Sequence, residues 1–191
     1  MQHEIRSCEI SCEVKENSGD LVLIGYPIIF EQLTRIKSPS GDYFEIIDKN
    51  ALSECILSGI PLIYNHNADS LPLAKSPDTM SLTITEKGLL MTATLANTQT
   101  GREIYEAVRR RDLSGMSFAF NVAQGGDSFD AASNTRTIKQ ISKIYECSIV
   151  VFPAYTGTTV EARSMIDTAR SRYNALRQAK IFINQLKKEN I

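Results

Sequence analysis

The sequence predicts an α+β fold made mostly of antiparallel strands, with a helical tail at the C-terminal end. Short apolar or alternating stretches recur from residue 4 to residue 152, separated by turn-forming residues, which is typical of strands and hairpins. Only two segments in this region carry helix signals. From about Asp167 the chain has helix formers and no Gly or Pro. We therefore expect the 191 residues to form one folded domain and an appended helix.

Strands account for most of the apolar pattern. A turn at residues 17–20 (NSGD) joins the first two strands as a hairpin, and residues 86–88 (EKG) turn a second hairpin. The last strand is expected to contain an irregularity near Ser142. The expected strands cover residues 4–14, 21–30, 60–66, 80–95, 116–122 and 136–152, and the expected loops cover 31–43, 67–79 and 124–135.

Two helices are expected within the domain. Asp48 can cap a short helix that runs to Ser58. Thr100 and Glu103 fit a capping box that opens a second helix, which runs to about Arg110. The inward face of the second helix is expected to contain Ile104, Tyr105 and Val108.

The C-terminal segment differs from the rest of the chain in pattern and charge. Its apolar residues lie close to a heptad spacing, at Ala169, Tyr173, Leu176 and Ile183. Residues 161–191 contain seven Lys or Arg and three Asp or Glu, so this segment carries +4 and residues 1–160 carry −5. We therefore place the domain at 1–160 and the helical tail at 161–191.

Charge and cysteine content exclude several classes of function. A net charge of −1 gives no strong bulk attraction to nucleic acid or to an anionic membrane, so neither is an expected partner. No apolar run follows Met1 and no stretch approaches a membrane span, so we expect a cytoplasmic location with reduced thiols. Cys8 and Cys12 have no neighbouring histidine, which makes a poor metal site, and no cofactor is expected.

His66 is the candidate general base. The chain has two histidines, and His3 lies at a terminus that is expected to fray. His66 ends an apolar strand at the edge of a loop, a common place for a catalytic group on a rigid support. If a histidine activates a serine or cysteine in this chain, His66 is that histidine. A structural histidine at a strand end is the alternative interpretation.

Ser117 is the candidate nucleophile. In a strand, its segment has one face that can enter the core, made of Met116, Phe118, Phe120 and Val122. The opposite face is small and polar and consists of Ser117, Ala119, Asn121 and Ala123. This face leaves room beside Ser117 for an imidazole and a peptide carbonyl, although close packing explains small residues equally well. Ser114 is a rival nucleophile, and Ser117 is preferred because it lies on the small face.

Glu146 is the candidate partner of the histidine. It lies within a strongly apolar strand at residues 144–152 (IYECSIVVF), where a buried carboxylate is costly unless it is paired. An imidazole held by this carboxylate would be kept in the useful tautomer and stabilised when charged. The alternative is an edge strand in which Glu146 faces water.

These segments, in this order, resemble the prohead serine proteases of tailed bacteriophages over residues 4–165. The resemblance is carried by NH at 65–66, SGMSFAF at 114–120 and ECSIVVFPAY at 146–155, with support from GYPIIF at 25–30, KGLL at 87–90 and RRRDLSG at 109–115. The phage family is distantly similar to the herpesvirus capsid assembly proteases. The resemblance therefore implies a herpesvirus-protease-like β-barrel of mostly antiparallel strands flanked by helices.

The resemblance also implies a catalytic triad. The family histidine falls on His66, the serine on Ser117 and the third member on Glu146, where the herpesvirus enzymes have a second histidine. Phage members commonly read N-H-D and S-F-G-F, whereas this chain has Asn67 and Ala119. No arginine-bearing loop for the oxyanion is evident after Glu146, so a backbone N–H is the expected donor.

The implied function is that of a serine endopeptidase in prohead maturation. Its substrates would be the scaffold protein, or a scaffold-like segment of the major capsid protein, and then the protease itself. The expected partners are the major capsid and scaffold proteins, with a second copy of the chain as a further candidate. It would act in the host cytoplasm, inside the assembling prohead. The tail at 161–191 would be a docking or self-cleaved segment, although a solvated or dimerising helix has the same composition.

Three other interpretations compete with a serine endopeptidase. The main alternative is a non-catalytic prohead assembly protein that only binds scaffold, and the presence of Ser117, His66 and Glu146 argues against it. An esterase is disfavoured because the chain has no G-x-S-x-G elbow and its residue order differs from that of the α/β-hydrolases. A Cys147 nucleophile would require that side chain to point away from Glu146.

Overall fold

The computed structural model describes residues 3–8, 13–17, 19–38 and 41–151, which form a mostly β structure with one short helix. The predicted tail therefore lies outside the described residues. The strands are β1 (Glu4–Cys8), β2 (Glu13–Asn17), β3 (Asp20–Ile29), β4 (Thr34–Ile36), β5 (Tyr43–Ile47), β6 (Pro61–Tyr64), β7 (Ala74–Lys75), β8 (Met80–Ile84), β9 (Gly88–Leu95), β10 (Gly115–Val122), β11 (Asp127–Asp130), β12 (Thr135–Ile138) and β13 (Ile141–Val150), and the helix is α1 (Gln99–Arg109).

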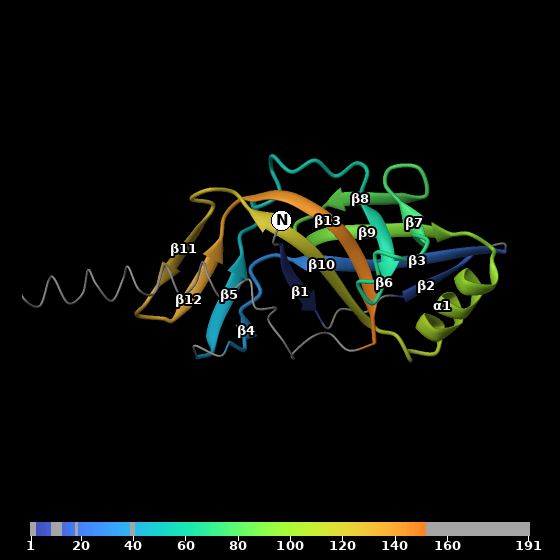
Figure 1. Cartoon of the computed structure of the whole chain (residues 1–191), viewed down its shortest axis with the longest axis horizontal. Coiled ribbons are helices and arrows are strands. Elements are labelled where there is room, and N and C mark those ends of the chain that lie inside the picture. The colour runs from blue at the N-terminus through green and yellow to red at the C-terminus, as the bar shows by residue number, and fades with distance from the viewer. Residues whose placement is uncertain (1–2, 9–12, 18, 39–40, 152–191) are drawn as a thin grey trace, which may run out of the picture.

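The described strands form three sheets and do not close into a barrel. The five-stranded sheet has the order β1-β10-β13-β6-β7, and the two four-stranded sheets have the orders β11-β12-β5-β4 and β2-β3-β9-β8. Figure 1 shows β10 and β13 crossing the middle of the molecule, with β11, β12, β5 and β4 at one end and α1 at the other. The closed barrel implied by the resemblance is therefore absent from the described strands, because they pair in three separate ladders. The helix α1 is not long and apolar enough to cross a membrane, and no other helix lies in the described part of the chain.

Most of the predicted strands are present, and the predicted hairpin at residues 86–88 is confirmed, since β8 pairs with β9 across the turn before Gly88. The turn at 17–20 is also confirmed by the pairing of Asn17 with Asp20, but the strand before it is β2 at residues 13–17. Of the single strand predicted over 4–14, residues 4–8 form β1 and pair with β10, whereas β2 begins at Glu13 and pairs with β3, so the described parts belong to two sheets; residues 9–12 lie outside the described residues. The predicted loops at 31–43, 67–79 and 124–135 contain short strands that have too few residues to show an alternation.

The two helix predictions had different outcomes. The helix from Asp48 to Ser58 was wrong: the segment is a series of turns, in which the Asp48 carboxylate accepts from the Asn50 N–H at 2.8 Å. This local hydrogen bond favours a turn over a helix in so short a segment. The second helix exists but begins earlier than predicted, because Thr98 caps it by accepting from the Gly101 N–H at 3.1 Å.

β13 is a central strand with two irregularities. It lies between β10 on one side, antiparallel, and β6 on the other, parallel. Ala119 pairs with Glu146 and the next residue, Phe120, pairs with Ile144, so Tyr145 is an extra residue in the ladder. A second register shift leaves out Ser142, which confirms the predicted irregularity. Bulges of this kind re-aim the side chains that follow them.

The core lies on one face of β10 and β13. Met116, Phe118 and Phe120 are at most 2% exposed, as the sequence predicted, and they pack with Cys147 and Ile149 in one cluster. The opposite face of β10 is also covered, because Ser117 is 0% and Ala119 is 1% exposed. Both faces of this strand are therefore buried, although one is apolar and the other small and polar.

A cluster of charges, all buried except the partly exposed Asp127, joins β1 to the sheet that contains β5 and β12. Its members, called the ionic cluster below, are Glu4, Arg6, Glu45, Asp127 and Arg136. Arg136 donates to Glu4 at 2.6 and 2.9 Å, to Glu45 at 3.0 Å and to Asp127 at 2.7 Å. Arg6 donates to Glu4 at 2.7 Å and binds both carboxylate oxygens of Glu45. Each of these arginines therefore contacts at least two carboxylates.

The ionic cluster couples the fold to pH. Burial alone would raise the pKa of Glu4, but the hydrogen bond to Arg136 and the charge of Arg6 outweigh burial and hold this pKa below its usual range. A carboxyl group with a lowered folded-state pKa stabilises the fold fully above its unfolded pKa of 4.5. That contribution is lost as the pH falls through the lowered pKa of Glu4.

Replacing Arg136 with Met should destabilise the protein strongly. The substitution leaves the carboxylates of Glu4 and Glu45 buried with less compensation, so we expect a loss of about 3–5 kcal/mol in the free energy of unfolding. Chemical denaturation of the full chain measures this value. The control is Arg35→Met, whose ion pair with Asp42 is exposed and should contribute less than about 1 kcal/mol. Equal stabilities of the two variants would contradict the assigned role of the ionic cluster.

Candidate active site

The candidate histidine lies in a tight turn directly after β6. Asn65 and His66 both have positive φ, 51° and 58°, and the Asn67 N–H donates to the Tyr64 carbonyl at 3.0 Å. Positive φ at both central residues with this hydrogen bond is the pattern of a type I′ turn, in which Asn is favoured. The Asn65 N–H also donates to the Ile149 carbonyl at 2.9 Å. The turn therefore reverses the chain alongside β13.

His66 and Glu146 are in direct contact. The Nδ1 atom of His66 lies 2.7 Å from Oε1 of Glu146, and their side chains are 26% and 11% exposed. Because a carboxylate only accepts, Nδ1 carries the proton and Nε2 of a neutral imidazole is left as an acceptor. Glu146 lies on the central strand β13, so the edge-strand alternative is wrong.

A serine on β13 completes the hydrogen bonding of this pair. Ser148 is 0% exposed, and its hydroxyl donates to Oε2 of Glu146 at 2.6 Å. The Ser148 hydroxyl oxygen in turn accepts from the His66 N–H at 3.2 Å. Each oxygen of the Glu146 carboxylate therefore has its own partner, as a buried carboxylate requires.

Ser117 faces the same side of the sheet as this pair. It is directly opposite Ser148 in the β10–β13 register, and directly opposite residues share a face. Ser148 and Glu146 are two residues apart on β13 and so share that face as well. Ser117, His66 and Glu146 consequently lie near one another.

The hydroxyl of Ser117 is engaged by β1. It donates to the Arg6 carbonyl at 2.8 Å and accepts from the Ser7 hydroxyl, also at 2.8 Å. Ser7 is directly opposite Ser117 in the β1–β10 register. The ionic cluster fixes the Arg6 side chain, so it also fixes the strand that contacts Ser117.

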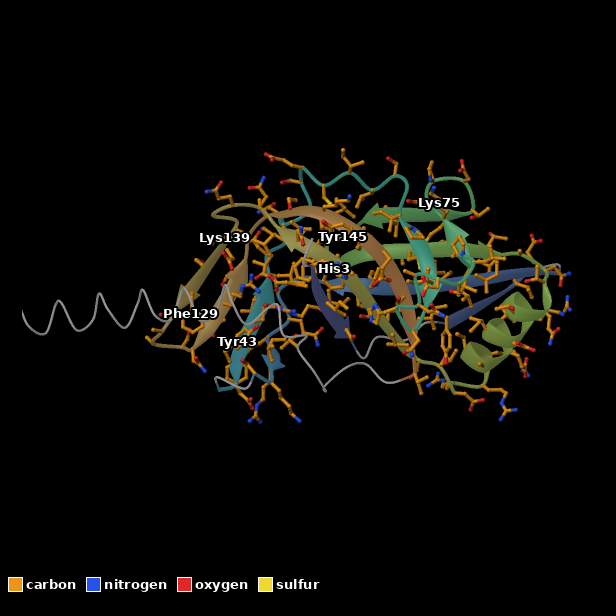
Figure 2. All side chains as sticks on the ribbon, viewed as in Figure 1. His3, Tyr43, Lys75, Phe129, Lys139 and Tyr145 are labelled. Atoms are coloured by element: carbon orange, nitrogen blue, oxygen red, sulfur yellow. The ribbon has the colours of Figure 1, made fainter. Side chains whose placement is uncertain are left out.

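The other candidate residues lie elsewhere. Ser114 is exposed and precedes β10, outside the strand. Cys147 packs in the hydrophobic core, on the face of β13 opposite to Glu146 and Ser148, so its thiol points away from the candidate base and does not fit the role of nucleophile. His3 packs beside Tyr145, with ring centroids 5.2 Å apart (Figure 2). In the part of the chain that the structure describes, no three His, Cys, Asp or Glu residues form a group that could hold a metal.

The two positions that depart from the phage pattern have specific places in the structure. Asn67 is the last residue of the turn, and its side-chain oxygen accepts from the Asp69 N–H at 3.1 Å, which an aspartate could also do. Ala119 is directly opposite Glu146 on β10. Its methyl group therefore lies on the site face, where a glycine would leave more space.

A comparison with protein-family models settles the family. The model described as caudovirus prohead serine protease matches residues 8–171, well over half of the chain. The chain belongs to this family. Comparisons with curated proteins and with solved structures gave no match.

Membership gives the general function. The family is that of the capsid-maturation serine proteases of tailed phages, and membership supports this general function for the chain. Proteases of this family associate with capsid proteins in the assembling prohead within the host cell. The resemblance drawn from the sequence is therefore confirmed for the phage family. The similarity to herpesvirus proteases stays a prediction.

Two residues of the site were missed by the sequence analysis. Ser148 lies two positions after Glu146, so the two-residue alternation of a strand could have placed it on the same face. Ser7 had no such signal, because its position depends on the pairing of β1 with β10. Sequence alone could thus have found one of the two.

The turn at Asn65 gives a direct test of this geometry. Asn65 is exposed, so its replacement removes little packing. Asn65→Val should lower the free energy of unfolding by about 1–2 kcal/mol, because a β-branched residue disfavours positive φ. Asn65→Gly should be close to neutral, since glycine adopts this conformation readily. Denaturation midpoints measure both, and a valine variant as stable as the glycine variant would contradict the assigned turn.

Proposed function

We propose that the chain is a serine endopeptidase with Ser117 as nucleophile, His66 as general base and Glu146 as the residue that orients His66. The observation that carries the proposal is the 2.7 Å contact between His66 Nδ1 and Glu146 Oε1, on the face of the sheet that also holds Ser117. This contact leaves Nε2 as the acceptor for the serine proton.

The chemistry is acyl transfer to serine. His66 takes the proton of the Ser117 hydroxyl as Oγ forms a bond to the scissile carbonyl carbon. The C–N bond then breaks, and His66 gives the proton to the leaving amine. Water, activated by the same imidazole, releases the acyl group from Ser117. Glu146 holds the ring and stabilises the imidazolium that forms in both steps.

The hydrogen bonds of Ser117 must be rearranged before the first step. Its proton is directed at the Arg6 carbonyl, so it has to be redirected to His66 Nε2. The hydroxyl is also fully buried, so a peptide carbonyl reaches it only after the residues that cover it have moved. This resting arrangement fits a protease whose activity begins inside an assembling capsid.

The proposed substrates are the scaffold protein or a scaffold-like segment of the major capsid protein, followed by the chain itself. The major capsid and scaffold proteins are the proposed partners, and a homodimer is a further one. The tail at 161–191 is proposed as the docking or self-cleaved segment, because its net charge of +4 suits an acidic scaffold.

A non-catalytic assembly protein is the second candidate. The observation that favours it is the complete burial of Ser117, together with its hydrogen bonds to β1. Labelling with a fluorophosphonate in co-assembled proheads separates the two candidates, because only an activated serine reacts.

Ser117→Ala should abolish cleavage. The chain is co-expressed with the major capsid and scaffold proteins of its own genome, and processing of the capsid precursor is followed on gels. The matched control is Ser114→Ala, which alters an exposed serine outside β10 and should leave processing unchanged. Equal processing by the native chain and by Ser117→Ala would refute the nucleophile assignment.

Glu146→Gln should slow cleavage by roughly 10²- to 10⁴-fold. The amide cannot stabilise the imidazolium as a carboxylate does, and it can hold the wrong tautomer of His66. The measurement is the processing rate in the same co-expression system. Undiminished cleavage would reduce the triad to a Ser117–His66 dyad while leaving the protease assignment intact.

A further inference from the structure

Ser148 is a fully buried hydroxyl that the proposed mechanism does not use. It is 0% exposed and lies on β13, two residues after Glu146. Its hydroxyl donates to one member of the candidate site and accepts from another. It donates to Glu146 Oε2 at 2.6 Å and accepts from the His66 N–H at 3.2 Å.

We propose that Ser148 is a positioning residue that fixes the Glu146 carboxylate and the His66 turn relative to each other. The inference rests on the proposed function, since it adds a residue to the same site. It acts through Glu146 and His66 and does not contact the substrate.

The first part of this role concerns the carboxylate. Glu146 Oε1 contacts the imidazole and Oε2 accepts from Ser148, so rotation of the carboxylate would break both contacts together. A carboxylate held at both oxygens keeps Oε1 aimed at His66 Nδ1. Without Ser148, Oε2 would be buried without a donor from this residue, and the carboxylate would be able to turn toward another partner.

The second part concerns the backbone of His66. Its positive φ of 58° is uncommon for a residue other than glycine, so the surrounding structure has to hold it. The Ile149 carbonyl holds Asn65 and the Ser148 hydroxyl holds the His66 N–H. Because β6 and β13 are parallel neighbours, these two contacts attach the turn to consecutive residues of β13. The same hydroxyl thus fixes both ends of the His66–Glu146 contact.

Ser148 does not fit the role of nucleophile. Its proton is donated to Glu146, which already contacts the imidazole, and its oxygen accepts from a backbone N–H, so the hydroxyl is not directed at the imidazole that would activate it. Ser117, its register neighbour on β10, lies on the same face without a contact to Glu146 in its resting state.

The test compares Ser148→Ala with Ser148→Cys, which nearly keeps the side-chain volume but is only a weak donor. The control is Ser142→Ala on the same strand, whose exposed hydroxyl bonds to the Asn121 carbonyl. Co-assembled proheads are labelled with a fluorophosphonate at a series of concentrations. The dependence of the labelling rate on concentration gives the maximal rate of serine modification and the reagent concentration at which half of that rate is reached. We expect both Ser148 variants to lower the maximal rate roughly tenfold, with the half-maximal concentration unchanged.

A spectroscopic readout separates positioning from a loss of stability. In NMR spectra of the full chain labelled with ¹⁵N-histidine, the proton between His66 Nδ1 and Glu146 is expected to give a low-field signal. The His3→Gln variant, which leaves His66 as the only histidine, assigns this signal to His66. We expect this signal to shift or broaden in Ser148→Ala and Ser148→Cys while thermal unfolding shows that the variants are folded. The inference would be overturned if both variants kept the histidine signal and the labelling rate of the native chain. It would also be overturned if mass spectrometry of the labelled native chain located the label on Ser148.

Failure of this inference is distinguishable from failure of the proposed function. If Ser117→Ala abolishes cleavage while both Ser148 variants behave as the native chain, the function stands and the positioning role is wrong. If Ser117→Ala cleaves normally, the function fails. The histidine signal would then still report whether Ser148 holds the His66–Glu146 pair.

Discussion

A carboxylate on a central β-strand is the constraint on which the candidate site depends. Glu146 lies on β13 with a strand on each side, and a charge in this position is tolerated only if it is fully hydrogen-bonded. The partners come from two directions, since His66 reaches one oxygen and Ser148 the other. Its pairing with Ala119 places the Glu146 side chain on the site face, and the bulge at Tyr145 lies directly before it.

The ionic cluster holds β1, the strand whose residues hydrogen-bond to the Ser117 hydroxyl. Replacing such a cluster with apolar residues of similar volume is often neutral, so its value lies as much in fixing one arrangement as in stability. Here it attaches the edge strand β1 to β5 and β12 through Arg6 and Glu4. The Arg6 carbonyl is thereby held against the Ser117 hydroxyl. The resting hydrogen bonds of Ser117 therefore depend on the ion pairs that attach β1 to the neighbouring sheet.

The elements that the sequence predicted correctly are those with strong local patterns. The hairpins at β2–β3 and β8–β9 have turn-forming residues between their strands, and the alternation in β10 separates Phe118 from Ser117. The predicted helix after Asp48 failed because so short a segment gains little from helix formation, and the Asp48 side chain offers a local turn that competes with a helix. The strands β4, β7 and β11 were missed because two to four residues cannot show a period.

The sequence by itself determined which side chains share a face and which residues have the right chemistry. Alternation along a strand is a property of backbone geometry, so it put Ser117 on the small face of its strand without reference to the rest of the molecule. Only the tertiary structure decided that His66 meets Glu146, 80 residues away, and that Ser7 meets Ser117, 110 residues away. Such pairings depend on the free energy of the whole fold, because the order of strands in a sheet has no local signature.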